Sequence, residues 1–214
     1  MRLGGATSFE TTGAGLVLVP LGSIEQHGPH LPLDTDTVIA VAVAEAVAAE
    51  APSSWGGTWV APPISYGSSG EHQSFPGTSS VGTDALTHQL VELVRSLRTW
   101  ADRVVFVNAH GGNVAALNAS DEIAWVPCAT EEVDLHAGFT ETSLMLHLRP
   151  GSVRLDRAEA GNTQPLSEIV PAMMAGGIAA VSANGVLGDP AGASAAEGER
   201  VLKAMVADVV GRLA

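Results

Sequence analysis

The stretch from Gly15 to Thr37 constrains the fold of this chain more than any other. Its apolar run at positions 16–19 is typical of a buried strand. Two imidazoles and three carboxylates then follow within twelve residues: Glu25, His27, His30, Asp34 and Asp36. Pro29 and Pro32 keep this part out of a regular helix. Burying unpaired charges is costly. A buried strand that leads directly into so many ionisable residues therefore predicts a functional site.

The mixture of side chains predicts a divalent metal site. Carboxylate and imidazole groups together suit hard or borderline cations. Glu25 and His27 are two residues apart, so both can point the same way from an extended segment. A solvated acidic loop with incidental histidines is the alternative. The preceding strand disfavours it, because open α/β sheets bind their ligands outside the carboxyl ends of their strands.

The composition narrows the class of protein and its partners. We expect a single domain over residues 1–214, a length that buries a sizeable core. The net charge is 10 − 23 = −13 with no basic run, which argues against nucleic acid or an anionic membrane as the partner. Cys128 is the only cysteine, so a reducing compartment fits. There is no membrane-spanning apolar stretch and no signal-peptide core, so we expect a cytoplasmic protein.

Strand and helix patterns alternate along the chain. The expected strands cover residues 16–19, 58–61, 103–107 and 125–129. The expected helices cover residues 36–51, 84–101 and 193–213, with shorter ones from Val114 and from Thr140. This alternation predicts an α/β layered fold in a single domain, with a mostly parallel central sheet. Residues 149–190 carry mixed patterns that predict no element.

Three turns at predicted strand ends carry ionisable side chains. In chain order these turns hold Glu25, His27 and Asp36; Asn108, His110 and Asn113; and His136 and Glu141. Because the carboxyl ends of parallel strands meet at one edge of a sheet, the three turns are expected to converge on one or two metal ions. The HExxH, GxSxG, GxGxxG and P-loop patterns are absent, which disfavours the common zinc-protease, serine-hydrolase and nucleotide sites.

The segment Tyr66–Gly82 is long and rich in glycine and serine. A loop of that length in a compact domain is usually functional. Its aromatic and ionisable side chains predict a wall of the site, with Tyr66, His72 or Phe75 in contact with the substrate. His88, by contrast, lies inside an expected helix and is interpreted as a surface or packing residue.

The segments GSIEQHGPHLPLDTDT, NAHGGN and HAGFTETSLML resemble the creatininase family of metal-dependent amidohydrolases. The resemblance covers nearly the whole chain. It implies a compact α/β fold, two divalent metal ions at the carboxyl ends of the strands, and a closed homo-oligomer, either a hexamer or an octamer. By motif, the metal-ligand positions are Glu25, His27, Asp36 and His110, with Asp36 bridging the ions. Iron, zinc or both are the expected metals, with manganese as a further candidate.

The chain departs from creatininase itself at two positions. Gly112 stands where that enzyme has a ligand glutamate, and Leu135 stands where it has the glutamate before the later histidine. Glu141 is the expected substitute carboxylate, as a metal ligand and in catalysis, and His136 is the expected proton carrier. The turn around His136 contains no tryptophan, which disfavours a creatinine pocket.

The resemblance implies hydrolysis of a peptide bond near the end of a short modified precursor peptide, which releases a C-terminal dipeptide derived from Val and Tyr. One alternative is another amidohydrolase of the family, acting on a cyclic amide or a formamide. The other is a structural or binding protein that a metal stabilises, without turnover. Structural metal sites are usually closed and sulfur-rich, whereas this one is oxygen-rich, which favours an enzyme.

Overall fold

Four parallel strands lie at the centre of the protein, in the order β2–β1–β3–β4. The computed structural model describes residues 1–129 and 134–214. The strands are β1 (Ala14–Leu21), β2 (Gly57–Val60), β3 (Ala101–Asn108) and β4 (Trp125–Pro127). This parallel sheet confirms the predicted α/β fold class.

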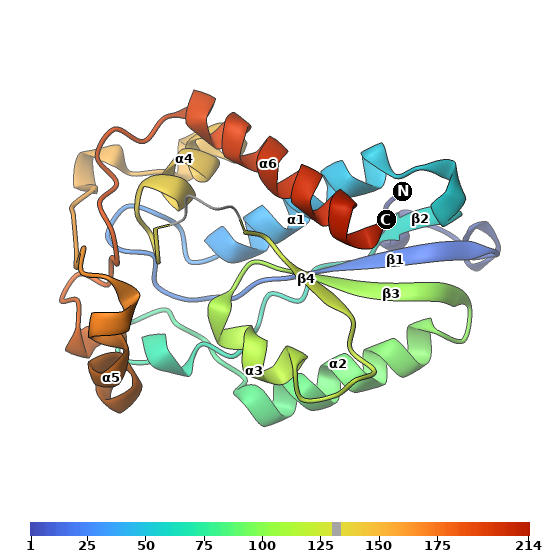
Figure 1. Ribbon diagram of the computed structural model, residues 1–214, viewed down its shortest axis with the longest axis horizontal. Coiled ribbons are helices and arrows are strands. Elements are labelled where there is room, and N and C mark those ends of the chain that lie inside the picture. Colours follow the sequence, from blue (N-terminus) through green and yellow to red (C-terminus); the bar gives the residue numbers. More distant parts are fainter. Residues whose placement is uncertain (130–133) are drawn as a thin grey trace.

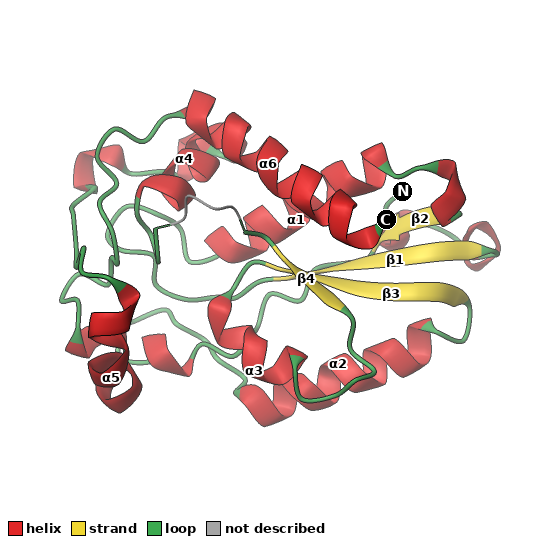
Figure 2. Ribbon diagram, viewed as in Figure 1, coloured by secondary structure: helices red, strands yellow, loops and turns green. Residues whose placement is uncertain are grey.

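Helices cover both faces of the sheet (Figure 1). On one face lie α1 (Thr35–Glu50), α4 (Phe139–Leu148) and α6 (Ala195–Leu213), and on the other lie α2 (Thr83–Leu97) and α3 (Val114–Leu117). The remaining helix, α5 (Leu166–Gly176), lies apart from the sheet, beyond the carboxyl ends of the strands. Figure 2 shows that loops dominate the end of the molecule that lies beyond the carboxyl ends of the strands.

Strand β1 is buried along its whole length, which explains its continuous apolar sequence. Val17, Val19 and Leu21 pack into the core on the α2 side. Leu16 and Leu18 pack on the opposite side, into the core that α1 and α6 cover. Because helices bury both faces of this parallel sheet, neither face needs polar residues.

The helix predicted for residues 84–101 is shorter in the structure. Helix α2 buries Leu86, Leu90 and Leu97 at the spacing of an amphipathic helix, and it ends at Leu97. A tight turn through Thr99 and Trp100 then leads directly into β3. The predicted range therefore ran into the following strand, which begins two residues earlier than expected.

Gly22 lets the start of α1 pack against the end of β1. A Cβ at this position would overlap the backbone of Thr37. Glycine is the residue that permits such a close approach of two backbones. The approach places Asp36, in the first turn of α1, beside the loop that carries Glu25 and His27.

Asn113 joins three segments at the carboxyl edge of the sheet. Its Nδ2 donates to the carbonyl oxygen of Gly22 at 3.0 Å and to Asn108 Oδ1 at 3.1 Å. Its Oδ1 accepts a hydrogen bond from the backbone N–H of Ser68 at 2.9 Å. The end of β1, the end of β3 and the start of the glycine-rich loop are therefore held together next to His110.

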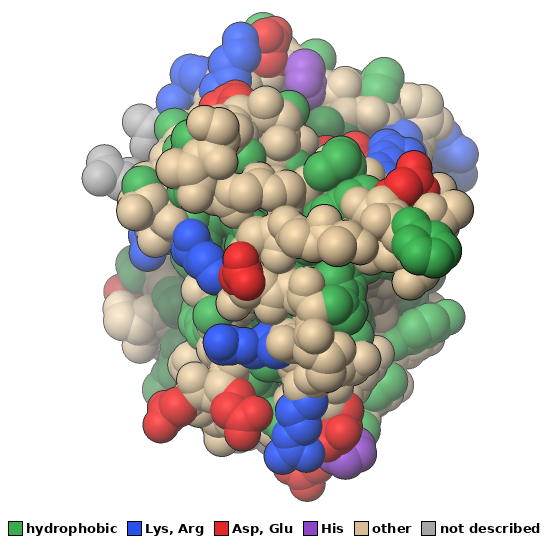
Figure 3. Space-filling model, turned by 90° about the vertical axis from the view of Figure 1, so that its right-hand side faces the viewer, with side chains coloured by type: hydrophobic (Ala, Val, Ile, Leu, Met, Phe, Trp, Pro, Cys, Tyr) green, Lys and Arg blue, Asp and Glu red, His purple; other side chains and the backbone are tan. Residues whose placement is uncertain are grey.

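The face at the amino-terminal ends of the strands lies away from this edge. Figure 3 shows basic and acidic side chains interspersed over it, with no patch of a single sign. Within residues 1–129 and 134–214, no helix is long and apolar enough to cross a membrane.

Candidate metal centre

Two groups of three side chains meet at the carboxyl edge of the sheet and share one carboxylate. Glu25, Asp36 and His110 form the first group. His27, Asp36 and Glu141 form the second. Within each group the potential ligand atoms all lie within 4.8 Å of one another. The structure thus brings together all five residues that the sequence suggested as metal ligands, and Asp36 occupies the shared position.

The placement of these side chains follows from the fold. Glu25 and His27 lie on the loop after β1, and His110 lies two residues after the end of β3. Asp36 and Glu141 lie in the first turns of α1 and α4. Strands β1 and β3 end in register, so the turns that follow them leave the sheet side by side.

The Glu25 carboxylate is fully buried, and its two oxygens face different partners. Its Oε2 accepts a hydrogen bond from Ser23 Oγ at 2.8 Å and lies 3.1 Å from His110 Nε2. Its Oε1 lies 3.3 Å from His72 Nε2. Burial raises the pKa of Glu25 to about 7, although the nearby His110 favours the charged carboxylate and so lowers this pKa.

His27 and Asp36 form the closest pair of the second group. His27 Nε2 lies 3.0 Å from Asp36 Oδ1 and 3.8 Å from Glu141 Oε2. Burial alone would lower the pKa of His27, but Asp36 and Glu141 raise it to about 10. The same pairing lowers the pKa of Asp36 despite its burial. A divalent cation at this position would take the place of the His27 proton, because imidazole ligates metals in its neutral form.

The donor set fits a divalent cation. Within the part of the chain that the structure describes, Glu25 Oε1 and Asp36 Oδ2 are buried and have no hydrogen-bond partner. A buried carboxylate oxygen without a partner is destabilising. Cations held between the two groups would satisfy both atoms. The available ligands are carboxylate oxygens and imidazole nitrogens, which zinc, iron and manganese all accept.

Glu141 is held in place by the turn before α4. Its Oε2 accepts a hydrogen bond from the backbone N–H of Ala137 at 2.6 Å. Ala137 has a φ of 52° and is the only non-glycine residue with a positive φ among those described. Because this conformation is strained for alanine, contacts such as the one to Glu141 are needed to maintain the turn. Burial raises the pKa of Glu141 to about 7.

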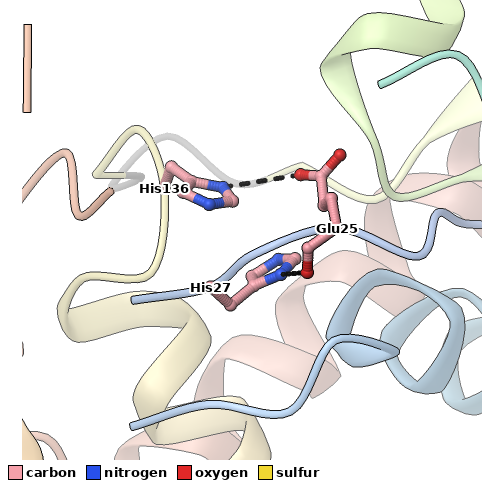
Figure 4. A group of neighbouring side chains, drawn as sticks. All are labelled: Glu25, His27 and His136. Carbon is pink, nitrogen blue, oxygen red and sulfur yellow. Dashed lines mark hydrogen bonds and ion pairs between the residues drawn. The ribbon is translucent and has the colours of Figure 1, made fainter. Parts of the chain in front are cut away.

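His136 comes from a different segment and points toward Glu25 (Figure 4). Its Nδ1 lies 3.8 Å from Glu25 Oε1, and its ring centroid lies 4.4 Å from that of His27. Its Nε2 lies 2.8 Å from the carbonyl oxygen of Gln26. A carbonyl only accepts, so Nε2 carries the hydrogen and Nδ1 faces the site. Burial, with His27 and His72 close by, lowers the pKa of His136 well below its ordinary value.

The glycine-rich loop lies only partly at the site. His72 is there, and its Nδ1 accepts a hydrogen bond from Gln26 Nε2 at 2.8 Å. Burial lowers the pKa of His72 to about 3. Phe75 packs instead into a small apolar cluster beside α5. Tyr66 is 57% exposed and, among the described residues, is not one of those that line the cavity of the site.

Two ionisable residues of the first polar stretch lie apart from the ligand groups. His30 Nε2 lies 2.9 Å from Thr142 Oγ1, within hydrogen-bond distance. Asp34 Oδ2 accepts a hydrogen bond from Arg149 at 2.8 Å on the surface. Neither belongs to the groups of potential metal ligands formed by the described residues.

The sequence did not single out Gln26, although it lies between two predicted ligands. Its side chain contacts His72, His136 and the carbonyl oxygen of Gly185. Regular alternation in an extended segment would turn it away from its two neighbours. Its position between two predicted ligands is the one signal available before the fold is known.

A cavity of about 140 Å³ opens beside the two groups. Its lining includes Asp36, His110, Cys128, His136 and Glu141. The volume corresponds to only a few water molecules. It therefore admits the reacting group of a substrate, while the rest of a larger substrate has to lie outside. Burial raises the pKa of the Cys128 thiol, which keeps it protonated.

Comparison with known proteins identifies the family of this chain. A family model described as creatininase, creatinine amidohydrolase, matches residues 6–213. The mycofactocin precursor peptide peptidase of Mycolicibacterium smegmatis is 55% identical over 201 aligned residues, which cover 89% of this chain and 81% of that protein. Two solved structures, a creatininase described as Mn and a mutant creatininase of Zn-Zn type, each match with a TM-score of 0.79 and 25% identity. Each match covers 99% of this chain and 96% of the other. The chain belongs to the creatininase family.

Proposed function

We propose that this chain is a metal-dependent peptidase that cleaves a mycofactocin precursor peptide. The observation that carries the proposal is the pair of ligand groups that share Asp36, with His136 beside them. The substrate is supported by the relative that is 55% identical, whose name states it.

In this proposal each ligand group holds one divalent ion. Glu25, Asp36 and His110 would hold one, and His27, Asp36 and Glu141 would hold the other. Zinc and manganese are supported by the descriptions of the solved creatininases, and iron suits the same ligands. When bound, such ions supply Lewis-acid polarisation of a carbonyl and make water reactive near neutral pH.

The other residues of the chain orient the substrate and move protons. The small cavity takes the scissile amide, and we assign contacts with the rest of the peptide to Tyr66, His72 and Phe75. His136 Nδ1 faces the reacting groups, takes up a proton from solvent and passes it to the nitrogen that leaves. Glu141, besides acting as a ligand, holds the turn that presents His136.

The experiment that tests this function is incubation of the metal-loaded enzyme with the modified precursor peptide, followed by mass spectrometry. We expect a shortened peptide and a C-terminal dipeptide derived from Val and Tyr. An uncut peptide together with hydrolysis of a cyclic amide or a formamide would favour the alternative amidohydrolase. A protein that binds metal and hydrolyses none of these would be a structural protein.

We also propose that the enzyme works in the cytoplasm as a closed homo-oligomer, either a hexamer or an octamer. The family resemblance supports the assembly. The single cysteine supports a reducing compartment. Mass photometry of the purified protein would measure the number of chains, and a monomer at micromolar concentration would contradict the assembly.

A further inference from the structure

The Glu71 carboxylate reaches the site but belongs to neither group of ligands proposed above. It lies with Glu25 and His72 in a third group, whose potential ligand atoms are within 4.8 Å of one another. Its Oε1 lies 3.5 Å from His110 Nε2. The Glu71 side chain is 31% exposed, whereas that of Glu25 is 1% exposed. Glu71 therefore touches both the buried cluster and the solvent.

Gly112 makes room for this carboxylate. A Cβ at position 112 would overlap Glu71 Oε1, His110 Nε2 and the carbonyl oxygen of Ser68. At the neighbouring Gly111, a Cβ would meet no atom within 4 Å. The lack of a side chain at position 112 therefore leaves a space that a carboxylate from another segment fills.

The backbone that carries Glu71 is anchored by apolar packing. Glu71 lies in the short 3-10 turn Gly70–His72, which packs against α5. Phe75, three residues further on, packs against the cluster that contains Ile169 of α5. The turn is thus fixed from its outer side, while the carboxylate points to the cluster of imidazoles and carboxylates.

We propose that Glu71 is a catalytic residue that accepts a proton from the attacking water. The inference rests on the amide hydrolysis proposed above. Glu25, Asp36 and Glu141 are assigned to the metal ions, and a carboxylate that ligates a cation is not free to take up a proton. Glu71 has no such assignment and is next to the same atoms.

The step balances as follows. The water oxygen bonds to the carbonyl carbon, the C–N bond breaks, and its electron pair stays on the nitrogen. One proton of the water passes to Glu71 and from there to the solvent that Glu71 touches. His136 Nδ1, which carries no hydrogen at the start, takes one proton from solvent and passes it to the nitrogen. The products are a carboxylic acid and an amine, with one water consumed.

Glu71→Gln in the metal-loaded enzyme tests the proposal, with any amide that the wild type hydrolyses. A wild type that leaves the precursor peptide intact but hydrolyses another amide overturns the proposed substrate and not the role of Glu71. Glu71→Gln should lower kcat by about 10²–10⁴-fold, the usual contribution of an acid–base group. KM and the metal content by elemental analysis should not change. Glu50→Gln, at an exposed position, is the matched control and should change none of these.

Glu71→Ala adds a second readout. Removal of the side chain opens space at the solvent boundary, so added formate should restore part of kcat in Glu71→Ala. Formate should not restore it in Glu71→Gln, whose amide fills the space. Gly112→Ala should lower kcat more than Gly111→Ala, because only its Cβ meets the carboxylate. A wild-type kcat in Glu71→Gln would overturn the proposal, and so would loss of bound metal in that variant, which would make Glu71 a ligand.

Discussion

Two parts of the site are held in place by different means: the sheet side, at the carboxyl ends of β1 and β3 and the start of α1, and the loop side, in the glycine-rich segment Tyr66–Gly82. Asp36 and His110 stand at the ends of regular elements, and their side chains are almost fully buried. On the loop side, Glu71 and Phe75 belong to an irregular segment that packs against α5 and the 3-10 turn Ile178–Ala180. Regular elements hold a constellation of ligands more accurately than loops do. This difference fits our proposal that the sheet side binds metal and that the loop side meets solvent and substrate.

Breaking the sheet side should have the largest effect. Asp36→Ala removes the carboxylate that both ligand groups share, so nearly all activity should be lost while circular dichroism shows a folded protein. Asp34→Ala is the matched control from the same stretch. It removes only an exposed pair with Arg149, which contributes at most about 1 kcal/mol, and should keep the wild-type kcat. A wild-type kcat in Asp36→Ala would contradict the shared role.

Removing the proton carrier should be the next largest effect. His136→Ala should retain its metal by elemental analysis and lose about 10²–10⁴-fold in kcat. His88→Ala, an exposed position on α2, is the control for loss of an imidazole. If kcat in His136→Ala equalled that of the wild type, His136 would have no part in the reaction.

Altering the loop side should change kinetics and leave the metal in place. A double Tyr66→Ala and Phe75→Ala variant should raise KM or lower kcat with unchanged metal content. Because Phe75 packs in the cluster beside α5, the thermal midpoint should be measured as well, to separate lost stability from lost substrate contact. Wild-type kinetics in the double variant would remove both residues from the substrate site.

The smallest effect concerns the metal-free protein. The pKa of His27 is raised to about 10 in the folded state, from an ordinary value of 6.5. Between these values the folded protein holds a proton that the unfolded chain has lost, so stability falls as pH rises through this window. Urea unfolding at several pH values above 7 should show this fall, and His27→Gln should reduce it. Stability that increases over the same range would contradict the pairing of His27 with Asp36.

The sheet side is also the part that could be predicted from the sequence. Glu25, His27 and Asp36 follow one apolar run, and His110 follows another, so local patterns place all four at strand ends. The contact between Glu71 and Gly112 joins two distant segments, and no local pattern reports it.

Helix α5 escaped prediction for a related reason. It buries only Ile169 and has Pro171 in its interior, so it lacks the periodic apolar face by which a helix is recognised. Helix α2 packs on the main core and carries that periodicity. Helix α5 packs mainly on a loop and does not.

The number of divalent ions bound per chain tests the central claim most directly. Zinc would be titrated into the metal-free protein by calorimetry, with elemental analysis after desalting. We expect two ions per chain in the wild type and one in Glu141→Gln, whose first ligand group stays complete. One ion per chain in the wild type, or two ions retained in Asp36→Ala, would contradict a centre built around a shared carboxylate.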